Sequence, residues 1–221
     1  MTNEINERYS RQADIVPRQR ILGCKATVIG VGAIGRQVAI QLTAMGIEQL
    51  QLIDFDLVDL SNLATQGYMV RDLNMFKTRA TAGFCREINP DMQIEVISER
   101  FKRSIDIGNC VFCCVDSVTA RRHIWAAVKN RVQFFVDGRM SAEVLRVITA
   151  CDEKSKAYYP QTLFTNSEAY IGTCTAKTTI YCANIAAGFM LVQFTRYLRL
   201  LAVEPDIQLN LLAAELNVGQ C

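Results

Sequence analysis

Short apolar runs alternate along the chain with longer stretches in which apolar residues recur every three or four positions. The short runs predict β-strands at 26–30, 49–54, 93–99, 110–116, 133–138 and 143–152, and the longer stretches predict α-helices at 34–45, 76–88, 119–130 and 178–201. Strands that alternate with helices are typical of βαβ units. The pattern therefore predicts a Rossmann-like α/β fold: a mainly parallel sheet with helices on both faces and antiparallel strands toward the C-terminal part, where residues 206–216 alternate.

The connection between the second predicted strand and the helix at 76–88 departs from this regular pattern. Residues 55–72 read FDLVDLSNLATQGYMVRD, an irregular polar stretch that is longer than most strand-to-helix connections. Its length indicates a functional role. The helix after it is expected to stop at Asn89, because a residue before proline, here Pro90, is disfavoured in the helical region.

The length and the N-terminus set the expected organisation. A chain of 221 residues is sufficient for one α/β domain, so we expect a single domain over 1–221 with an N-terminal helical arm over about residues 1–23. The start, MTNEINERYSRQ, lacks the apolar core of a secretion signal, and no apolar run is long enough to span a membrane. These features predict a soluble, cytoplasmic protein with no membrane partner.

Charge and cysteine content exclude further classes. The 24 Lys and Arg residues against 22 Asp and Glu residues give a formal charge of +2, which does not indicate a nucleic-acid partner. Nine cysteines in such a chain are expected to be reduced thiols. Cys110 and Cys113 form a C-x-x-C pair inside a predicted strand, but no second pair follows and His123 is the only histidine. We therefore expect no zinc site.

The sequence VIGVGAIGRQ joins the first predicted strand to the first long helix. Gly30 permits the turn, Gly32 lets a phosphate approach the backbone, and Gly35 allows the helix to pack closely on the strand. Asp54, at the end of the second predicted strand, can accept hydrogen bonds from a ribose. This pattern predicts a nucleotide site and fits NAD and ATP equally.

Residues further along the chain favour ATP. A hydride-transfer enzyme needs a substrate domain, for which the chain has little room. Phosphoryl chemistry needs cations for the phosphates and a carboxylate for Mg²⁺, and the candidates are Lys77, Arg11 and Asp116. Lys77 begins a helix, where the dipole disfavours a cation, so an anionic ligand would explain its position.

Seven features together resemble the ubiquitin-activating-enzyme-like adenylyltransferase family, which includes the ThiF, MoeB and HesA proteins. They are RYSRQ, GVGAIG, LIDFDLVDLSNL, Lys77, INPDMQIEV, CVDSVTARR and Cys174, in the order of the family and over most of the chain. The resemblance implies cleavage of ATP between its α- and β-phosphates while the C-terminal glycine carboxylate of a ubiquitin-like or sulfur-carrier protein attacks the α-phosphate. The products are an acyl-adenylate and pyrophosphate, and a downstream conjugating enzyme is a possible further partner.

The resemblance also implies roles for individual residues. Gly32 and Gly35 would line the phosphates, Asp54 would hold the ribose, and Asn62 and Lys77 would contact phosphate oxygens. Asp116 would hold Mg²⁺, and Arg11 would reach the ATP of a partner subunit, which implies a homodimer. The absence of an added catalytic-cysteine or ubiquitin-fold domain resembles the bacterial branch, including short enzymes of bacterial ubiquitin-like conjugation systems.

The sequence departs from the family pattern at two places. Thr65 stands where the family commonly has an arginine, in the segment NLATQ, and Arg36 and Arg71 are the candidates to replace that charge. The paired C-x-x-C motifs that bind structural zinc in many relatives are also missing. Cys174 matches a cysteine that in several relatives accepts the activated carboxyl group or takes part in sulfur transfer; a helix N-terminus and Lys177 would activate its thiolate, and the alternative is a partly buried structural thiol.

Other polar and aromatic residues receive simpler interpretations. Asp56 and Asp59 are expected to solvate and cap the loop, Arg121 and Arg122 to lie on an exposed helix face, and His123 to be a surface or packed imidazole. Residues 137–139 are either a hairpin-like connection or a surface for the carrier's tail. A last set is expected in the core or, for the aromatic members, at a dimer interface: Cys182, Trp125, Phe189, Phe194 and Tyr197.

Three alternatives to adenylation stay open. An NAD(P)-dependent oxidoreductase would bind nicotinamide and show no pyrophosphate exchange. A catalytically silent module would bind the ubiquitin-like protein or ATP without turnover, which the threonine at position 65 makes plausible. A sulfur-transfer enzyme would require Cys174 for its product but not for the adenylate.

Overall fold

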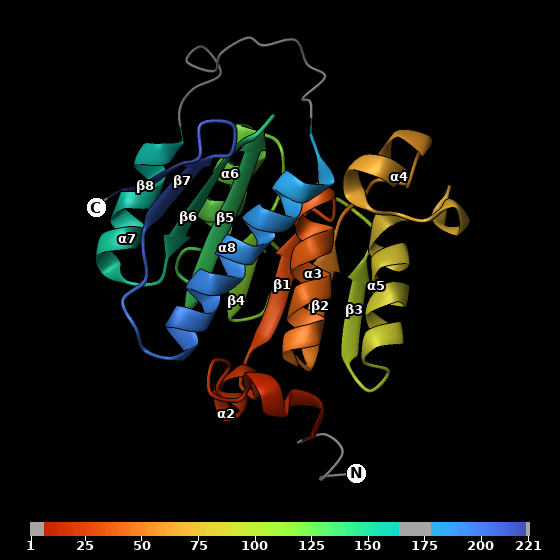
Figure 1. Ribbon diagram of the computed structural model, residues 1–221, viewed down its shortest axis with the longest axis horizontal. Coiled ribbons are helices and arrows are strands. Elements are labelled where there is room, and N and C mark those ends of the chain that lie inside the picture. The colour runs from red at the N-terminus through yellow and green to blue at the C-terminus, as the bar shows by residue number, and fades with distance from the viewer. Residues whose placement is uncertain (1–6, 164–177, 220–221) are drawn as a thin grey trace.

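The strands of the protein form one mixed sheet with helices on both faces (Figure 1). The computed structural model describes residues 7–163 and 178–219, and within these the strand order is β3-β2-β1-β4-β5-β6-β7-β8. The first five strands in this order, β3-β2-β1-β4-β5, pair in parallel, and the strands from β5 to β8 pair antiparallel. Their bounds are β1 (Lys25–Ile29), β2 (Gln49–Ile53), β3 (Gln93–Ile97), β4 (Cys110–Cys113), β5 (Phe134–Ser141), β6 (Val144–Ala150), β7 (Asp206–Asn210) and β8 (Glu215–Gly219).

The helices follow the predicted alternation. Their bounds are α2 (Arg18–Leu22), α3 (Ala33–Met45), α4 (Leu60–Gln66), α5 (Lys77–Ile88), α6 (Val118–Val128), α7 (Glu153–Tyr158) and α8 (Ile180–Leu198), with the short 3-10 helices η1 (Ser10–Gln12), η2 (Val70–Asp72) and η3 (Tyr159–Thr162). The predicted fold class is therefore confirmed. Helix α5 ends at Ile88, and Asn89 is already extended, as Pro90 requires.

The structure changes one predicted boundary, adds a helix and agrees with the predicted C-terminal strands. Strand β5 continues to Ser141, so residues 137–139 lie inside a strand and do not form a connection, because β6 pairs with them in register. Helix α7, which the sequence analysis does not predict, begins with a capping box between Asp152 and Ser155. The alternating C-terminal stretch is the hairpin β7–β8.

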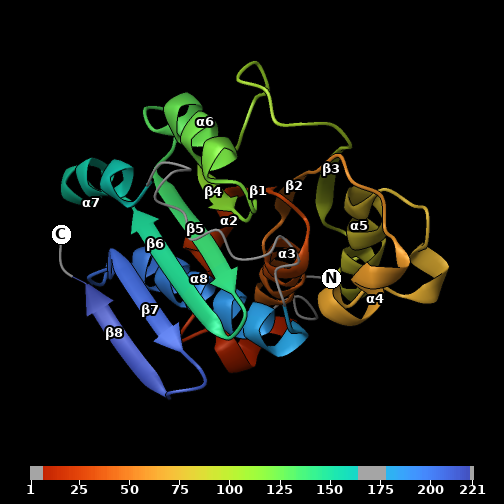
Figure 2. The ribbon, with the colours of Figure 1, turned by 90° about the horizontal axis from the view of Figure 1, so that it is seen from above.

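The core has two parts, one on each face of the sheet. Successive residues of a strand point to opposite faces, so Phe134 packs on Phe194 of α8 at 5.3 Å between ring centroids, whereas Phe135 packs on Trp125 of α6 at 5.0 Å. Helices α3, α5 and α8 cover the first face, and α6 with η3 covers the second (Figure 2). Trp125, Phe194 and Cys182 are buried, which confirms their prediction as core residues.

The described part of the N-terminal arm lies at the edge of the sheet where the parallel strands begin (Figure 1). It comprises η1 and α2, and the Gln12 side chain donates hydrogen bonds to the carbonyls of Ala44 and Met45 at the C-terminal end of α3. None of the described helices has the length and hydropathy needed to cross a bilayer.

Candidate functional site

The glycine loop lies at the point where the strand order reverses. β2 and β3 lie on one side of β1, and β4 and β5 on the other. Ile29 pairs with Ile53 of β2 and with Cys113 of β4, so the three strands end at the same edge. In sheets of this kind ligands bind outside the carboxyl ends of the strands at such a switch point. The loops after β1, β2 and β4 therefore meet where a ligand is expected.

Two of the loop glycines are required by the backbone geometry. Gly30 has φ of 85°, and a Cβ there would lie 2.8 Å from the Cys114 carbonyl oxygen of the loop after β4. A Cβ on Gly35 would lie 1.8 Å from the Gly30 carbonyl oxygen, so no larger residue fits between α3 and the loop. These close approaches confirm the packing reason given for the glycines from the sequence.

The surroundings of Gly32, by contrast, would accept a Cβ without a close approach. The nearest atom to a Cβ on Gly32 is Oε1 of Gln66, at 3.7 Å, and this oxygen is buried without a hydrogen-bond partner among the described residues. A side-chain amide can present its NH₂ group instead by turning about its last bond. Gln66 and the first N–H groups of α3, which have no carbonyl partner within the helix, can therefore bind a ligand beside the loop.

Asp54 holds the loop in place. It is 9% exposed, and its carboxylate accepts hydrogen bonds from the backbone N–H of Val31 at 2.6 Å and of Asp56 at 2.8 Å. Burial raises the pKa of Asp54, and the two backbone N–H groups oppose that rise. Each carboxylate oxygen can accept a second hydrogen bond, so the ribose role predicted for Asp54 is compatible with this position.

Lys77 lies next to the same loop. It is the first residue of α5, is 7% exposed, and its Nζ lies 3.0 Å from Oδ2 of Asp56. Asp56 is thus one anionic partner for the cation at this helix start, and it is more than a solvated loop residue. The Asp56 side chain is 46% exposed, so the pair lies at the edge of the protein surface.

Helix α4 carries Thr65, at the position where the family resemblance predicts an arginine. Asp59 caps the helix and forms a capping box with Asn62, as its interpretation as a capping residue predicts. Asn62 is buried, and its Oδ1 accepts from the Asp59 N–H, while its Nδ2 lies 3.3 Å from Oγ of Ser61. The Thr65 hydroxyl donates to the Ser61 carbonyl at 2.9 Å within the same helix.

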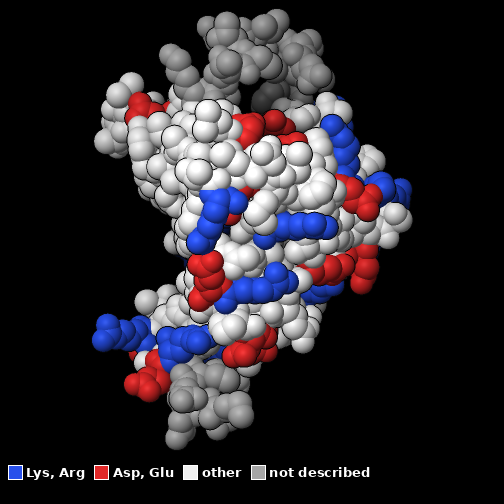
Figure 3. Space-filling model, turned by 90° about the vertical axis from the view of Figure 1, so that its right-hand side faces the viewer, with Lys and Arg blue, Asp and Glu red and all other residues white. Residues whose placement is uncertain are grey.

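Neither predicted replacement for that arginine has a free, exposed charge among the described residues. Arg36 is 1% exposed and is enclosed by Tyr68 and Phe84. Arg71 is exposed and pairs with Glu87 of α5 at 3.0 Å. Basic and acidic side chains are interleaved over the face that α5 occupies (Figure 3).

Asp116 follows β4 at the same edge of the sheet. Its side chain is exposed and makes no hydrogen bond or ion pair with residues 7–163 or 178–219. Its carbonyl accepts a hydrogen bond of 3.0 Å from Nη1 of Arg121. The prediction that Arg121 lies on an exposed face is wrong: it is 5% exposed, because its Nε pairs with the Asp137 carboxylate at 2.9 Å. Arg122 and His123 are exposed, as predicted.

Asp137 is the centre of a buried polar cluster behind this edge. It is fully buried in β5, and its Oδ2 accepts from Nε of Arg139 at 2.8 Å and from the Tyr159 hydroxyl at 2.9 Å. Arg139 in turn donates to the carbonyl and hydroxyl of Thr162. Asp137 is therefore neither part of a connection nor a surface for a carrier's tail. The sequence shows no local signal for this cluster, since its members come from three separate elements.

The remaining site residues lie elsewhere. Arg11 is exposed in η1, beside the C-terminal end of α3, whereas the glycine loop lies at the N-terminal end of that 13-residue helix. At 1.5 Å per residue the helix separates them by about 20 Å. Cys174 and Lys177 lie outside the described residues. Cys110 and Cys113 are buried in β4, and burial, followed by the charge of Asp137, raises the pKa of Cys113 to about 12.

The chemistry of the side chains at this edge is compatible with Mg²⁺ bound together with phosphates. Mg²⁺ is commonly bound by one or two carboxylates together with substrate phosphates, and Asp116 offers one such exposed carboxylate. The described residues contain no cluster of three or more His, Cys, Asp or Glu side chains that could hold a metal ion without a ligand. Two residues beside the loop that sequence analysis did not single out are Gln66, whose Oε1 lacks a hydrogen-bond partner among the described residues, and Tyr68, whose hydroxyl donates to the Val31 carbonyl at 2.5 Å.

Together the fold and the site define a Rossmann-like α/β domain. Its glycine loop, of the kind that binds anions, lies where the strand order reverses. The sequence pattern of the ThiF family matches residues 8–217, so the chain belongs to the ThiF family.

Curated relatives carry names from that family. The chain is 31% identical over 131 residues to the sulfur carrier protein ThiS adenylyltransferase of Escherichia coli, with 54% of this chain and 52% of that protein covered. It is 30% identical over 135 residues to the molybdopterin-synthase adenylyltransferase of Haemophilus influenzae, with 56% of each covered. The match to ubiquitin-like modifier-activating enzyme 5 of Branchiostoma floridae covers 81% of this chain and 51% of that protein at 26% identity. The chain thus spans about half the length of these relatives.

Solved structures share the fold. PaaA superposes with a TM-score of 0.82 at 20% identity, covering 100% of this chain and 74% of that chain. The microcin C7 biosynthetic enzyme MccB, solved with N-formylated MccA, gives a TM-score of 0.82 at 15% identity, covering 97% and 72%. MccB of E. coli has also been solved with ATP, with a TM-score of 0.74 at 15% identity and coverage of 96% and 71%.

Proposed function

We propose that this domain binds ATP with Mg²⁺ and adenylates the C-terminal glycine carboxylate of a ubiquitin-like or sulfur-carrier protein. The observation that supports the proposal is that the glycine loop, the buried Asp54 and the exposed Asp116 follow three strands that end at the same edge of the sheet. Lys77 pairs with Asp56, which also follows the second of these strands. The names of the curated relatives, two of which are adenylyltransferases, support the same reaction.

Each residue has a physical task in this reaction. The N–H groups at the start of α3 and the Lys77 ammonium neutralise phosphate charge, and Asp54 orients the ribose while it fixes Val31. Asp116 would hold Mg²⁺, which screens the phosphate oxygens when it is bound. Lys77 must exchange its partner Asp56, or share it, to reach a phosphate.

The bond changes balance without a general base. An oxygen of the carrier's carboxylate, already ionised at neutral pH, forms a bond to the α-phosphorus, while the bond from that phosphorus to the bridging oxygen of the β-phosphate breaks. Pyrophosphate leaves with the electron pair. Catalysis then consists of positioning and charge neutralisation, which accounts for a site without a histidine.

Arg11 can assist only another copy of the chain. It lies at the opposite end of α3 from the glycine loop, so it does not reach the loop of its own subunit. We therefore include a homodimer, with Arg11 near the partner's phosphates, in the proposal. Transfer of the activated carboxyl group to Cys174 as a thioester, a sulfur-transfer step, a downstream conjugating enzyme and a cytoplasmic location belong to the proposal in the same way.

ATP–pyrophosphate exchange tests the reaction. The probe is a small ubiquitin-like protein with a free C-terminal glycine, added with saturating ATP and Mg²⁺. We expect exchange in the wild type, none in D116A, and unchanged exchange in the control D106A, whose side chain is 93% exposed on another loop. Loss of product, but not of exchange, in C174A would indicate thioester or sulfur transfer. Exchange in D116A at the wild-type rate would refute the role of Asp116.

The dimer has its own test. R11A and D116A are each expected to be inactive. In an equal mixture about half of the dimers contain one copy of each variant, and one of the two sites in such a dimer combines an intact Asp116 with an intact Arg11. The mixture is therefore expected to regain about a quarter of the activity. No recovery, with R11A fully active alone, would remove Arg11 from the site.

A silent binding module is the second candidate, and the observation that favours it is Thr65. Its hydroxyl bonds within α4, Arg36 is buried, and Arg71 pairs with Glu87, so neither arginine offers an exposed charge to a phosphate. Such a module would bind ATP or the carrier without exchange. Binding of NADH in preference to ATP would instead favour an oxidoreductase.

A further inference from the structure

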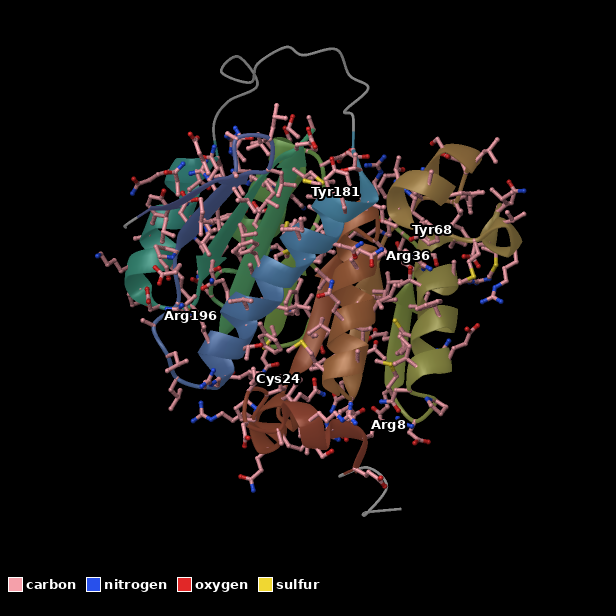
Figure 4. All side chains as sticks on the ribbon, viewed as in Figure 1. Arg8, Cys24, Arg36, Tyr68, Tyr181 and Arg196 are labelled. Carbon is pink, nitrogen blue, oxygen red and sulfur yellow. The ribbon has the colours of Figure 1, made fainter. Side chains whose placement is uncertain are left out.

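Arg36 is a buried cation directly behind the glycine loop. It follows Gly35 in α3 and is 1% exposed. Its Nε donates to the Gly67 carbonyl at 3.2 Å and its Nη1 to the Thr81 hydroxyl at 3.2 Å. The guanidinium carbon lies 4.3 Å from the ring centre of Tyr68, and Figure 4 shows the two side chains next to each other.

This arginine has no carboxylate in ion-pair contact among residues 7–163 and 178–219. Two acids, Asp54 and Asp72, act electrostatically on the same tyrosine, Tyr68, and each is already bound by a backbone N–H group. A buried charge without a direct partner is unfavourable. Its retention in the core calls for a compensating role.

Hydrogen bonds connect the arginine to the loop. Nη1 of Arg36 donates to Thr81, whose hydroxyl lies 3.2 Å from the Tyr68 hydroxyl. The Tyr68 hydroxyl donates to the carbonyl of Val31, the residue between Gly30 and Gly32. The positive charge therefore lies beneath the backbone over which the phosphates of the proposed function would bind.

The buried charges around the loop depend on Arg36 for their balance. Asp54 and Asp72 are 9% and 8% exposed, and Lys77 and Arg36 are 7% and 1% exposed. Without Arg36 this buried set would carry a net negative charge next to a ligand that is itself strongly negative. A charge acts through the protein interior with little screening, so it does not have to touch the ligand.

We infer that Arg36 supplies positive charge to the bound phosphates from beneath the glycine loop. The inference rests on the proposed function, because it concerns the same nucleotide site. It assigns Arg36 an electrostatic role in phosphate affinity, without contact to the ligand. It also gives a reason for a buried arginine in the first turn of α3.

Ligands that differ in the number of phosphates distinguish this electrostatic role from a structural one. Isothermal titration would measure the binding of ATP, ADP, AMP and adenosine to the wild type, R36M, R36K, R36M/T65R and the control R71M. Arg71 offers a matched change, since its side chain is 62% exposed and pairs with Glu87. Circular dichroism would record the melting temperature of each variant.

The expected result is graded by charge. R36M should bind ATP about tenfold more weakly than the wild type does. Its affinity for AMP should fall less, and its affinity for adenosine should equal that of the wild type. R36K and R36M/T65R should recover most of the ATP affinity, R71M should not change it, and R36M should melt no lower than R36K. T65R in the wild-type background should strengthen ATP binding, so the idea stays testable if R36M does not fold.

Three results would overturn the inference while leaving the proposed function intact. They are an unchanged ATP affinity in R36M, an equal loss for adenosine and ATP, and an R36K as weak as R36M. If the wild type binds none of the four ligands, the proposed function fails and the inference fails with it.

Discussion

Replacing Asp137 by asparagine tests how much the buried cluster behind the site contributes to stability. The Asp137 carboxylate is fully buried and accepts from Arg121 at 2.9 Å, from Arg139 at 2.8 Å and from the Tyr159 hydroxyl at 2.9 Å. D137N keeps the shape and one acceptor oxygen, but it leaves two guanidinium groups, whose side chains are 6% and 11% exposed, without a counter-charge.

The magnitude follows from this geometry. Removing one partner of a buried ion pair costs about 3–5 kcal/mol of stability. Because D137N retains one acceptor oxygen, we expect it to lose about 3 kcal/mol. For a chain of this size that corresponds to a fall in melting temperature of roughly 6–12 °C. Asp106, which is 93% exposed and lies 3.6 Å from Arg131, provides the control: D106N should change the stability by less than about 1 kcal/mol.

Thermal melts and urea titrations followed by circular dichroism measure the effect. The double variant D137N/R139M should recover part of the loss, because it removes one of the two unpaired cations. A D137N protein that melts within about 2 °C of the wild type would show that the cluster is not coupled to folding in this way.

Two further predictions concern the loop and the C-terminal hairpin. G35A should abolish nucleotide binding and destabilise the fold, since its Cβ would lie 1.8 Å from the Gly30 carbonyl oxygen; G83A, an exposed site in α5 with no atom within 4 Å, should stabilise the protein by about 0.5–1 kcal/mol, and chemical denaturation compares the two. Asp206 is 6% exposed, and although burial alone would raise its pKa, the hydrogen bonds from Arg146 lower it. The stability that the Asp206 carboxylate contributes is therefore present above about pH 4 and is lost as the pH falls through the lowered pKa. D206N should have a lower free energy of unfolding than the wild type at pH 7 and should lose less of it on acidification. Equal pH profiles of the two proteins would contradict this.

Part of the site was predictable because its signals are local. The three glycines, Asp54 and Lys77 lie at strand ends and helix starts, and the order of strands and helices follows from apolar periodicity. The capping role of Asp59 is also a local pattern. Roles that the family resemblance adds, such as the ribose contact of Asp54 and the metal contact of Asp116, stay predictions.

Other features could not be predicted because they depend on contacts between distant segments. The sequence places Arg121 on a helix, but its burial is decided by Asp137, 16 residues later in β5. The environment of Arg36 comes from Tyr68 and Thr81, which lie 32 and 45 residues away and are brought together by the packing of α3 on α5.

By itself, then, the sequence determined the α/β class, the glycine loop and the acids and the lysine that follow the strands, because backbone preference and side-chain periodicity act over neighbouring residues. The tertiary structure decided which charges are buried, which are paired, and on which side of the loop each one lies. These outcomes depend on which elements pack together, and a charge is stabilised or destabilised by every group around it, whatever its distance along the chain.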